Sequence, residues 1–417
     1  MNGRVPRRTF LGAATAAAAG AGLVGCATAG VDPAQRTTPA NTTVASTAGS
    51  PGPTATTPAT PASPSSTKAA RNLTTVMSGD LLWHNTLWFT AANDHRRTGK
   101  GKEFDFDPMF EMVKPIIDGA DLAIAHNEVP FARPGGPYTG YPLFSAPPQI
   151  ADWMATMGWD MATTASNHSI DMGFAGLERT VDLMRAAGLA VVGTWKTAAE
   201  AATPAVVTRA GVKVAVVSGT YGLNGLVAPR GKEWCVSLWD VDRMLADARA
   251  ARAAGAEIVM AHLHGGEEYQ TAPSRDQVIR ATALANAPEI DLVFGEHVHV
   301  VQPITMINKT WVVYGMGNMV AQHRSTVPRG AEGITVRFTW QEQDSPLPGK
   351  QGRFRVAKAE YIPTFISSHL DDGVARLFPV NQALREGSWS KSRLTVARDR
   401  TRQAVHSLQP PAGLIEV

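Results

Sequence analysis

The sequence predicts an α/β fold that begins after residue 70, and three observations lead to this prediction. Short apolar runs typical of buried strands alternate with stretches of helical periodicity, as they do in α/β proteins. Two later runs, 333–340 and 354–366, look like strands with no helix between them, so we expect a sheet that becomes mixed at one side. An apolar content of 44% over 417 residues is sufficient for a large core.

The expected elements follow from the period of the apolar residues along the chain. Buried strands are expected at 73–78, 122–125, 161–165, 212–219, 257–263, 292–295 and 311–314. Helices are expected at 176–187, 241–254 and 277–286. Segment 371–417 shows neither period, so we expect an irregular tail that packs on the surface of the domain.

The first 70 residues are expected to lie outside the folded domain. Residues 1–26 resemble a twin-arginine lipoprotein signal, because Arg7-Arg8 precedes an apolar run and Leu23-Val24-Gly25-Cys26 resembles a lipobox. Cys26 is then the predicted lipidation site, which would anchor the exported chain to the outer face of the cytoplasmic membrane. The alternative is an ordinary cleaved signal with a chance cysteine. Residues 27–70, rich in Thr, Ala, Pro and Ser, are expected to be a disordered linker.

Charge and cysteine content exclude two kinds of site. The formal net charge is +3, but Arg4, Arg7 and Arg8 all precede Cys26, so 3 − 3 leaves the mature chain formally neutral. We therefore expect no nucleic-acid partner, which would require a clustered basic face. The two cysteines, Cys26 and Cys235, are too few for a disulfide framework or a cysteine-ligated zinc site. Any metal site must use histidine, carboxylate and amide ligands.

Polar side chains gather at the ends of the expected strands. The segments that carry them are 78–80, 126–128, 166–168, 262–264 and 295–299. The carboxyl ends of strands meet in one crevice of an open α/β sheet, so these segments are expected to converge. A His-x-His pattern in an extended strand places both imidazoles on the same side. Such ligands suit Mn, Zn or Fe, and two divalent ions of this kind would clamp a phosphoryl group and activate a water.

Taken together, these motifs resemble a known family. Their order, Gly-Asp, Glu, Asn-His, His and Gly-x-His-x-His, resembles the calcineurin-like metallophosphoesterases and, more closely, the CapA family of poly-gamma-glutamate capsule synthesis proteins. The likeness is carried by Gly79-Asp80, 126–130, 166–173, 221–225, 264–269 and 314–318. It implies a layered α-β-β-α sandwich with mixed sheets over residues 71–370, on which the tail 371–417 packs.

The resemblance implies a role for each matching residue. The implied ligands of two divalent ions, with Glu128 between them, are Asp80, His84, Glu128, Asn167, His262, His264, His297 and His299. His168 is the implied general acid or transition-state stabiliser, and Asp171 its orienting partner. Glu268, Tyr269 and Asn318 are the implied substrate residues.

Two departures from the family pattern affect the ligand set. Leu82 stands where the superfamily has a histidine two residues after the aspartate, so His84 is the nearest imidazole for that position. His126 stands where the CapA family usually has asparagine.

Other positions leave alternatives open. Either His262 or His264 completes the cluster, and the His-x-Gly-x-Glu-Tyr pattern favours His264. Asp171 is as compatible with a helix N-cap as with a partner of His168, and Asn318 is compatible with a turn. Glu268 is as compatible with a supporting role beside the ligands as with substrate contact.

We therefore expect a CapA-like metal-dependent hydrolase or transferase of the cell envelope. Its expected substrate is an anionic capsule, poly-gamma-glutamate or cell-wall polymer, or another phosphoester, attacked by a metal-activated water. One alternative is a non-catalytic envelope lipoprotein that binds an anionic polymer or assembles a capsule export machine. A second alternative is a mononuclear metal amidase.

Overall fold

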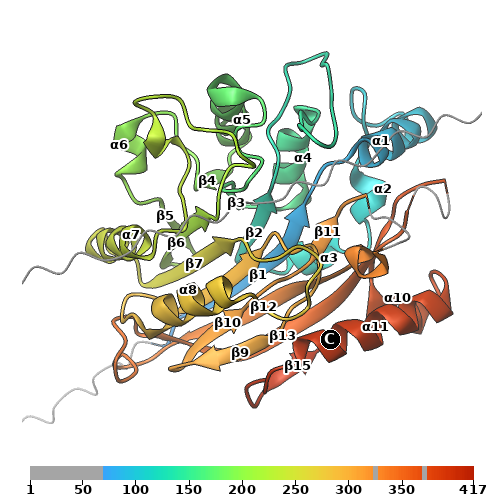
Figure 1. Cartoon of the computed structure of the whole chain (residues 1–417). Coiled ribbons are helices and arrows are strands. Elements are labelled where there is room, and N and C mark those ends of the chain that lie inside the picture. Colours follow the sequence, from blue (N-terminus) through green and yellow to red (C-terminus); the bar gives the residue numbers. More distant parts are fainter. Residues whose placement is uncertain (1–68, 323–326, 369–372) are drawn as a thin grey trace, which may run out of the picture. The chain divides into compact units, whose positions relative to one another are not determined.

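The computed structural model describes residues 69–322, 327–368 and 373–417 (Figure 1). The predicted signal, its Cys26 and nearly all of the predicted linker lie outside the described residues. Within the described ranges, no helix combines the length and the apolar character that crossing a membrane requires.

The first sheet combines strands from both ends of the domain. In the part of the chain that the structure describes it has nine strands, in the order β14-β13-β12-β1-β2-β3-β4, with β11 beside β1 and β15 beside β13. The bounds are β1 Asn72–Leu81, β2 Leu122–Asn127, β3 Met161–Thr163, β4 Ala190–Val192, β11 Asn318–Val320, β12 Glu332–Glu342, β13 Phe354–Ile366, β14 Leu377–Pro379 and β15 Leu414–Glu416. Strands β1 to β4 are parallel, whereas β12 pairs antiparallel with both β1 and β13.

The second sheet has six strands among the described residues, in the order β5-β6-β7-β8-β10-β9. The bounds are β5 Val206–Arg209, β6 Val212–Thr220, β7 Ile258–His264, β8 Leu292–Glu296, β9 Ile304–Ile307 and β10 Thr310–Val313. The four central strands are parallel, and the edge strands β5 and β9 are antiparallel to their neighbours. Both sheets are therefore mixed, as the sequence predicts.

Helices cover the outer faces of the two sheets (Figure 1). Their bounds are α1 Asn85–Thr98, α2 Asp107–Phe110, α3 Lys114–Asp118, α4 Gln149–Met157, α5 Gly173–Ala186, α6 Ala198–Ala201, α7 Val241–Ala253, α8 Arg275–Asn286, α10 Val380–Glu386 and α11 Lys391–Val405, with 3-10 turns at Glu233–Cys235 and Pro328–Ala331. Apolar residues of α7 and α8 form one buried cluster with the outer face of the six-stranded sheet. A larger cluster joins α1, α4 and α5 to the nine-stranded sheet.

The inner faces of the two sheets share a third core. Alternate residues of a strand point to opposite faces, so every second side chain enters this layer. Met77 of β1, Val214 and Val216 of β6 and Phe338 of β12 all belong to this buried cluster. The α-β-β-α sandwich predicted from the family resemblance is confirmed.

The C-terminal segment differs from its prediction as an irregular tail. Residues 373–417 contain β14, α10, α11 and β15, and β15 adds a parallel strand beside β13. The middle of the buried face of α11 consists of Ala397, Thr401 and Ala404, with Leu394 and Val405 toward its two ends. Small and hydroxyl side chains give little contrast with the polar face, and for that reason the helical period was not visible in the sequence.

Candidate metal centre

Carboxylates and imidazoles from both sheets meet at one point. Asp80, Glu128 and His299 each offer a ligand atom within 4.8 Å of the other two, and Glu128, His264 and His297 form a second such group. Nδ1 of His299 lies 3.1 Å from Oδ2 of Asp80. Oε1 of Glu128 lies 3.8 Å from Nε2 of His264 and 3.9 Å from Nε2 of His299. Glu128 is therefore common to two neighbouring ligand groups.

The strand order explains why residues so distant in sequence come together. Asp80 is the penultimate residue of β1 and pairs with His126 of the parallel strand β2, and Glu128 follows that strand. In the other sheet, His264 ends β7 opposite Glu296, the last residue of β8. Parallel strands end at the same edge of a sheet, so each sheet presents its polar residues at one edge.

The backbone after β8 has an unusual conformation. His297 and His299 have φ angles of 92° and 56°, in the left-handed region that side chains with a Cβ rarely adopt. Such a conformation costs on the order of 1–3 kcal/mol per residue and persists where the surroundings impose it. The amide of His297 donates to both carboxylate oxygens of Asp80, at 3.3 and 3.4 Å. This turn holds the main chain at His297, as well as the imidazole of His299, against the aspartate.

Asn167, which follows β3, extends the second group. Its Oδ1 lies 2.7 Å from Nε2 of His264, and its Nδ2 donates to Oδ1 of Asn224 at 3.0 Å. The amide orientation therefore directs an oxygen ligand to the same point as the imidazole of His264.

The donor atoms at this point fit a divalent cation. Buried polar atoms are almost always hydrogen-bonded, and an unpaired one costs about 1–3 kcal/mol. Among the described residues, buried atoms without a hydrogen-bond partner include both carboxylate oxygens of Glu128 together with Nδ1 of His297. Buried carboxylate and imidazole atoms of this kind are the ligands that Mn, Zn and Fe take in proteins.

Burial sets the protonation states of the cluster. It lowers the pKa of His126 and of His262 to about 3, and it lowers the pKa of His264 and His297 well below the usual value. These rings are neutral at pH 7, which is the form that binds metal.

Two groups carry the opposite shift. Burial, aided by the charge of Asp80, raises the pKa of Glu128 well above its usual value. Burial alone would lower the pKa of His299, but Glu128 and Asp80 outweigh it and raise the pKa to about 10. The negative charge of these carboxylates thus favours a proton on His299 when no cation is bound. Metal binding would release that proton.

His168 lies beside this cluster with a defined orientation. Its Nδ1 donates to Oδ2 of Asp171 at 2.7 Å, and the same oxygen accepts the amide of Phe144 at 2.8 Å. The α5 helix begins after Met172 without a side-chain cap, so Asp171 contacts His168 instead of capping the helix. The tautomer with hydrogen on Nδ1 leaves Nε2 of His168 available for proton exchange.

A cavity of about 530 Å³ opens beside the cluster. Its lining includes His168, His299, Glu268, Tyr269 and Asn318. Cavities of this size hold small-molecule ligands or single units of a polymer.

The other predicted residues occupy different positions around the cluster. The Glu268 carboxylate forms a ligand group with His297 and His299. The Tyr269 ring lies 5.9 Å from the ring of His299, and Oδ1 of Asn318 lies 3.0 Å from Nδ1 of His299. Asn318 therefore orients a predicted ligand as well as lining the cavity.

Two predicted ligands lie away from the shared carboxylate. His84 belongs to none of the ligand groups found in the described ranges; its Nδ1 lies 3.1 Å from the carbonyl oxygen of Leu82 and 3.2 Å from the amide nitrogen of Gln322, and the residue lines the cavity. His262 groups with His126 and His264 and not with Glu128. Of the two histidines left open by the sequence, His264 is the one that lies beside Glu128.

Sequence reasoning assigned no role to two residues of this region. His126 and Glu296 are both buried, and each directs a polar atom without a partner into the cluster. His126 precedes Glu128 by the same two-residue interval that separates His262 from His264. That repeat was a usable signal, whereas Glu296 required knowledge of the β7–β8 register.

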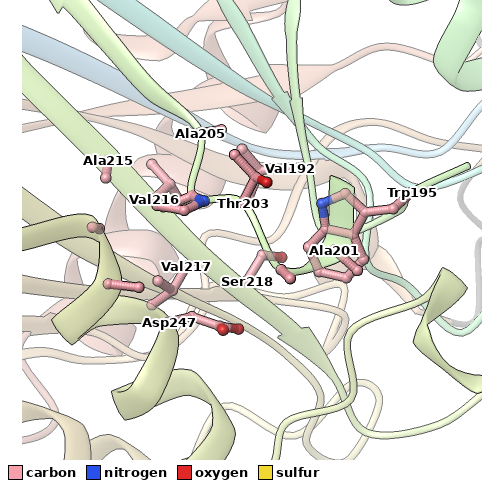
Figure 2. A pocket seen from close by; sticks show the side chains of 14 residues that line it. Val192, Trp195, Ala201, Thr203, Ala205, Ala215, Val216, Val217, Ser218 and Asp247 are labelled. Carbon is pink, nitrogen blue, oxygen red and sulfur yellow. The ribbon is translucent and has the colours of Figure 1, made fainter. Parts of the chain in front are cut away.

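Figure 2 shows a separate pocket, between β6, α6 and α7, of about 40 Å³. Its polar lining includes Ser218 and Asp247, and the Asp247 carboxylate accepts Nε of Arg243 at 2.9 and 3.0 Å. This space is close to that of one water molecule, so the pocket is too small for a polymer unit.

Comparison with known proteins identifies relatives of the chain. The model of the family "Bacterial capsule synthesis protein PGA_cap" matches residues 74–323. The chain is 27% identical over 167 residues to the "Capsule biosynthesis protein CapA" of Bacillus anthracis, covering 39% of this chain and 40% of that protein. It is 24% identical over 223 residues to the "PGA biosynthesis protein CapA" of Bacillus subtilis (strain 168), covering 51% and 57%.

The chain thus spans about half the length of the curated relatives it matches. Among solved structures it is similar to the calcineurin-like phosphoesterase YfkN from Bacillus subtilis, with a TM-score of 0.44 and 15% identity over 79% of this chain and 99% of that one.

Proposed function

Because this chain belongs to the bacterial capsule synthesis protein PGA_cap family, we propose that it is a metal-dependent hydrolase or transferase acting on a capsule or cell-wall polymer. The observation that carries the proposal is the sharing of Glu128 between two ligand groups, with both of its oxygens buried and unpaired within the described residues. A carboxylate in this position suits a ligand that bridges two cations.

The two proposed cations share Glu128 and differ in their other ligands. Asp80, Glu128 and His299 would hold one, and Glu128, Asn167, His264 and His297 the other, with Glu268 at the exposed side. When bound, two divalent cations supply Lewis-acid activation of water and stabilise negative charge on a phosphoryl or carbonyl group.

The residues of this chain perform the remaining tasks. His168, oriented by Asp171, exchanges a proton with the substrate through Nε2 at the wall of the cavity. Asn224 supports this ring, with Nδ2 at 3.4 and 3.5 Å from its two nitrogens. Tyr141 and Tyr269, which are 71% and 46% exposed, give the cavity aromatic walls that position a polymer unit.

The reaction is tested with purified full-length chain, its metal content and a substrate panel. The panel contains an aryl phosphate and a gamma-glutamyl peptide, which separate phosphoester from amide hydrolysis. Two ions per chain, with turnover that disappears in His168→Ala and persists in the off-site control His95→Ala, would support the enzyme. If neither the wild type nor Asp80→Ala contains metal, and the two behave alike on the substrate panel, the result would instead support a non-catalytic binding protein. Turnover with one ion per chain would support a mononuclear amidase.

Export and anchoring are proposed from the sequence alone. The twin arginines and Cys26 suggest a lipoprotein on the outer face of the cytoplasmic membrane, with residues 27–70 as its linker. Membrane fractionation of Cys26→Ser, compared with Cys235→Ser, tests this part. Loss of membrane association in the first variant alone is expected, and equal association of both would refute the anchor.

A further inference from the structure

A second polar cluster lies deeper than the proposed catalytic centre. It consists of His126, His262 and Glu296, which are 1%, 0% and 1% exposed, and we call it the deep cluster. None of the three is assigned to either cation of the proposed catalytic centre, although the family resemblance implied His262 as a ligand there. One ring nitrogen each of His126, His262 and His264 lies within 4.8 Å of the others, and Nε2 of His262 is in direct contact with Oε2 of Glu296.

Both imidazoles of the deep cluster are oriented in the same way. Nδ1 of His126 lies 3.0 Å from Oγ1 of Thr163, and Nδ1 of His262 lies 2.7 Å from Oγ of Ser218. Oγ1 of Thr163 is itself directed to the carbonyl oxygen of Ala125 at 3.4 Å, so it accepts the Nδ1 hydrogen of His126. Metal-binding histidines in proteins commonly have one nitrogen fixed by such a partner while the other faces the ion.

Apart from the contact between His262 and Glu296, the remaining nitrogen and oxygen atoms of this region lack a hydrogen-bond partner among the described residues. Nε2 of His126 and Oε1 of Glu296 are buried and lack a hydrogen-bond partner among the described residues. Nδ1 of His264 is a third such atom, because the contact of this ring with Asn167 uses Nε2. A hydrogen-bonded structural network would satisfy these atoms, whereas a cation site leaves lone pairs free to bind the ion.

We propose that the imidazoles of His126, His262 and His264, with Glu296 in contact with His262, form a further metal site that binds one divalent cation such as Zn²⁺. Three imidazoles, or two imidazoles and one carboxylate, are ligand sets that Zn²⁺ takes in proteins. The site is built from strand ends that the catalytic proposal also uses, but it depends on neither the reaction nor the bridging role of Glu128. Its burial indicates a structural ion that joins β2 of one sheet to β7 and β8 of the other.

The test counts Zn²⁺ ions bound to the full-length chain after loading and removal of free metal, by elemental analysis. We expect three ions in the wild type and one fewer in each of His126→Asn, His262→Asn and Glu296→Gln. His406→Asn, a histidine beside Tyr361 and far along the chain, is the matched control and should retain three. Glu296→Gln preserves side-chain shape, and His126→Asn introduces the residue usual in the resembling family. We therefore expect these two variants to remain folded, which circular dichroism checks, so that a lost ion reflects a lost ligand.

Two outcomes separate this proposal from the catalytic one. If Asp80→Ala loses an ion while all three deep-cluster variants keep the wild-type number, the deep site is refuted and the catalytic centre stands. If the deep-cluster variants lose an ion that Asp80→Ala retains, the deep site stands whatever the activity of the protein.

Discussion

Nδ1 of His299 lies 3.1 Å from Oδ2 of Asp80, although 219 residues separate the two in the chain. The pair joins the end of β1 in one sheet to the turn after β8 in the other. Both side chains are buried, so the aspartate stabilises positive charge at this point, whether a proton or a cation supplies it.

Asp80→Asn tests this pairing without changing side-chain volume. The amide removes a negative charge and a strong ligand, so we expect lower metal occupancy and turnover reduced by at least about 100-fold. Elemental analysis and the substrate panel measure the two effects. Asp247→Asn, in the pocket of Figure 2, is the control and should retain both properties. Unchanged metal content in Asp80→Asn would contradict the ligand role.

Asp171→Asn separates orientation of His168 from metal binding. The variant loses the carboxylate that fixes the Nδ1–H tautomer, so we expect kcat to fall by about 10- to 1,000-fold. KM and metal content should change little, because neither depends on this carboxylate. Equal loss in His168→Ala and in the double variant would show that Asp171 acts through His168. Full activity of Asp171→Asn would rule out that role.

Gly79→Ala tests the close approach of the backbones at Gly79 and Gly317, next to Asp80. A Cβ at Gly79 would lie 1.9 Å from the carbonyl oxygen of Gly317, and backbone cannot move aside as a side-chain tip does. That same oxygen accepts the amide of Asp80 at 3.0 Å. We expect the free energy of unfolding, measured by urea titration, to fall by about 2–4 kcal/mol, and we expect the variant to bind less metal. Gly222→Ala, where a Cβ meets open space, should stay within about 0.5 kcal/mol of the wild type.

Metal removal should destabilise the protein reversibly. Without a cation, the buried atoms of Glu128 and His297 stay unpaired and the left-handed turn loses a restraint. A cation at 100 times its dissociation constant stabilises the native state by about 2.7 kcal/mol. Thermal unfolding with chelator should therefore occur several degrees lower, and added Zn²⁺ or Mn²⁺ should restore it. An unfolding temperature insensitive to both treatments would argue against any bound ion.

The C-terminal strand predicts a pH-dependent contribution to stability. Burial alone would raise the pKa of Glu416, but hydrogen bonds from Arg402, Tyr361 and Asn381 outweigh it and lower the pKa to about 2. A depressed carboxyl pKa adds stability above pH 4.5, and this stability is lost as the pH falls from 4.5 toward 2. Arg402 is 51% exposed, so solvent screening reduces the effect to about 1–2 kcal/mol.

Glu416→Gln should therefore be less stable than the wild type at pH 7, and the difference should shrink at pH 3. Urea unfolding at the two pH values measures it. Glu386→Gln, an exposed glutamate, is the control with little effect at either pH. If the difference in unfolding free energy between Glu416→Gln and the wild type is the same at both pH values, the effect comes from packing and not from the charge.

Much of the fold was predictable because its central strands are buried on both faces. Continuous apolar runs such as those of β2 and β7 are recognisable as buried strands in the sequence. The polar residues at their ends indicate the edge of the sheet where the site lies. The first half of the domain was less visible, since no pattern predicted α1 or α4. The buried face of α1 mixes Leu87 and Trp88 with Thr90 and Asp94, so its period is obscured.

The contents of the candidate site depended on register as well as sequence. The motif order indicated Asp80, Glu128 and His297, which the structure brings together. Sequence could not decide between His262 and His264, because both point to the same side of β7. The choice follows from the packing of the two sheets, which places the second of them beside Glu128.

The division of ligands between the two sheets has a consequence for biosynthesis. Asp80, Glu128 and Asn167 come early in the chain, while His264, His297 and His299 come late, the last of them at residue 299 of 417. The proposed cation site would therefore be complete only after residue 299 has been synthesised. A chain that ends before residue 264 would lack all three of these imidazole ligands, which the second sheet supplies.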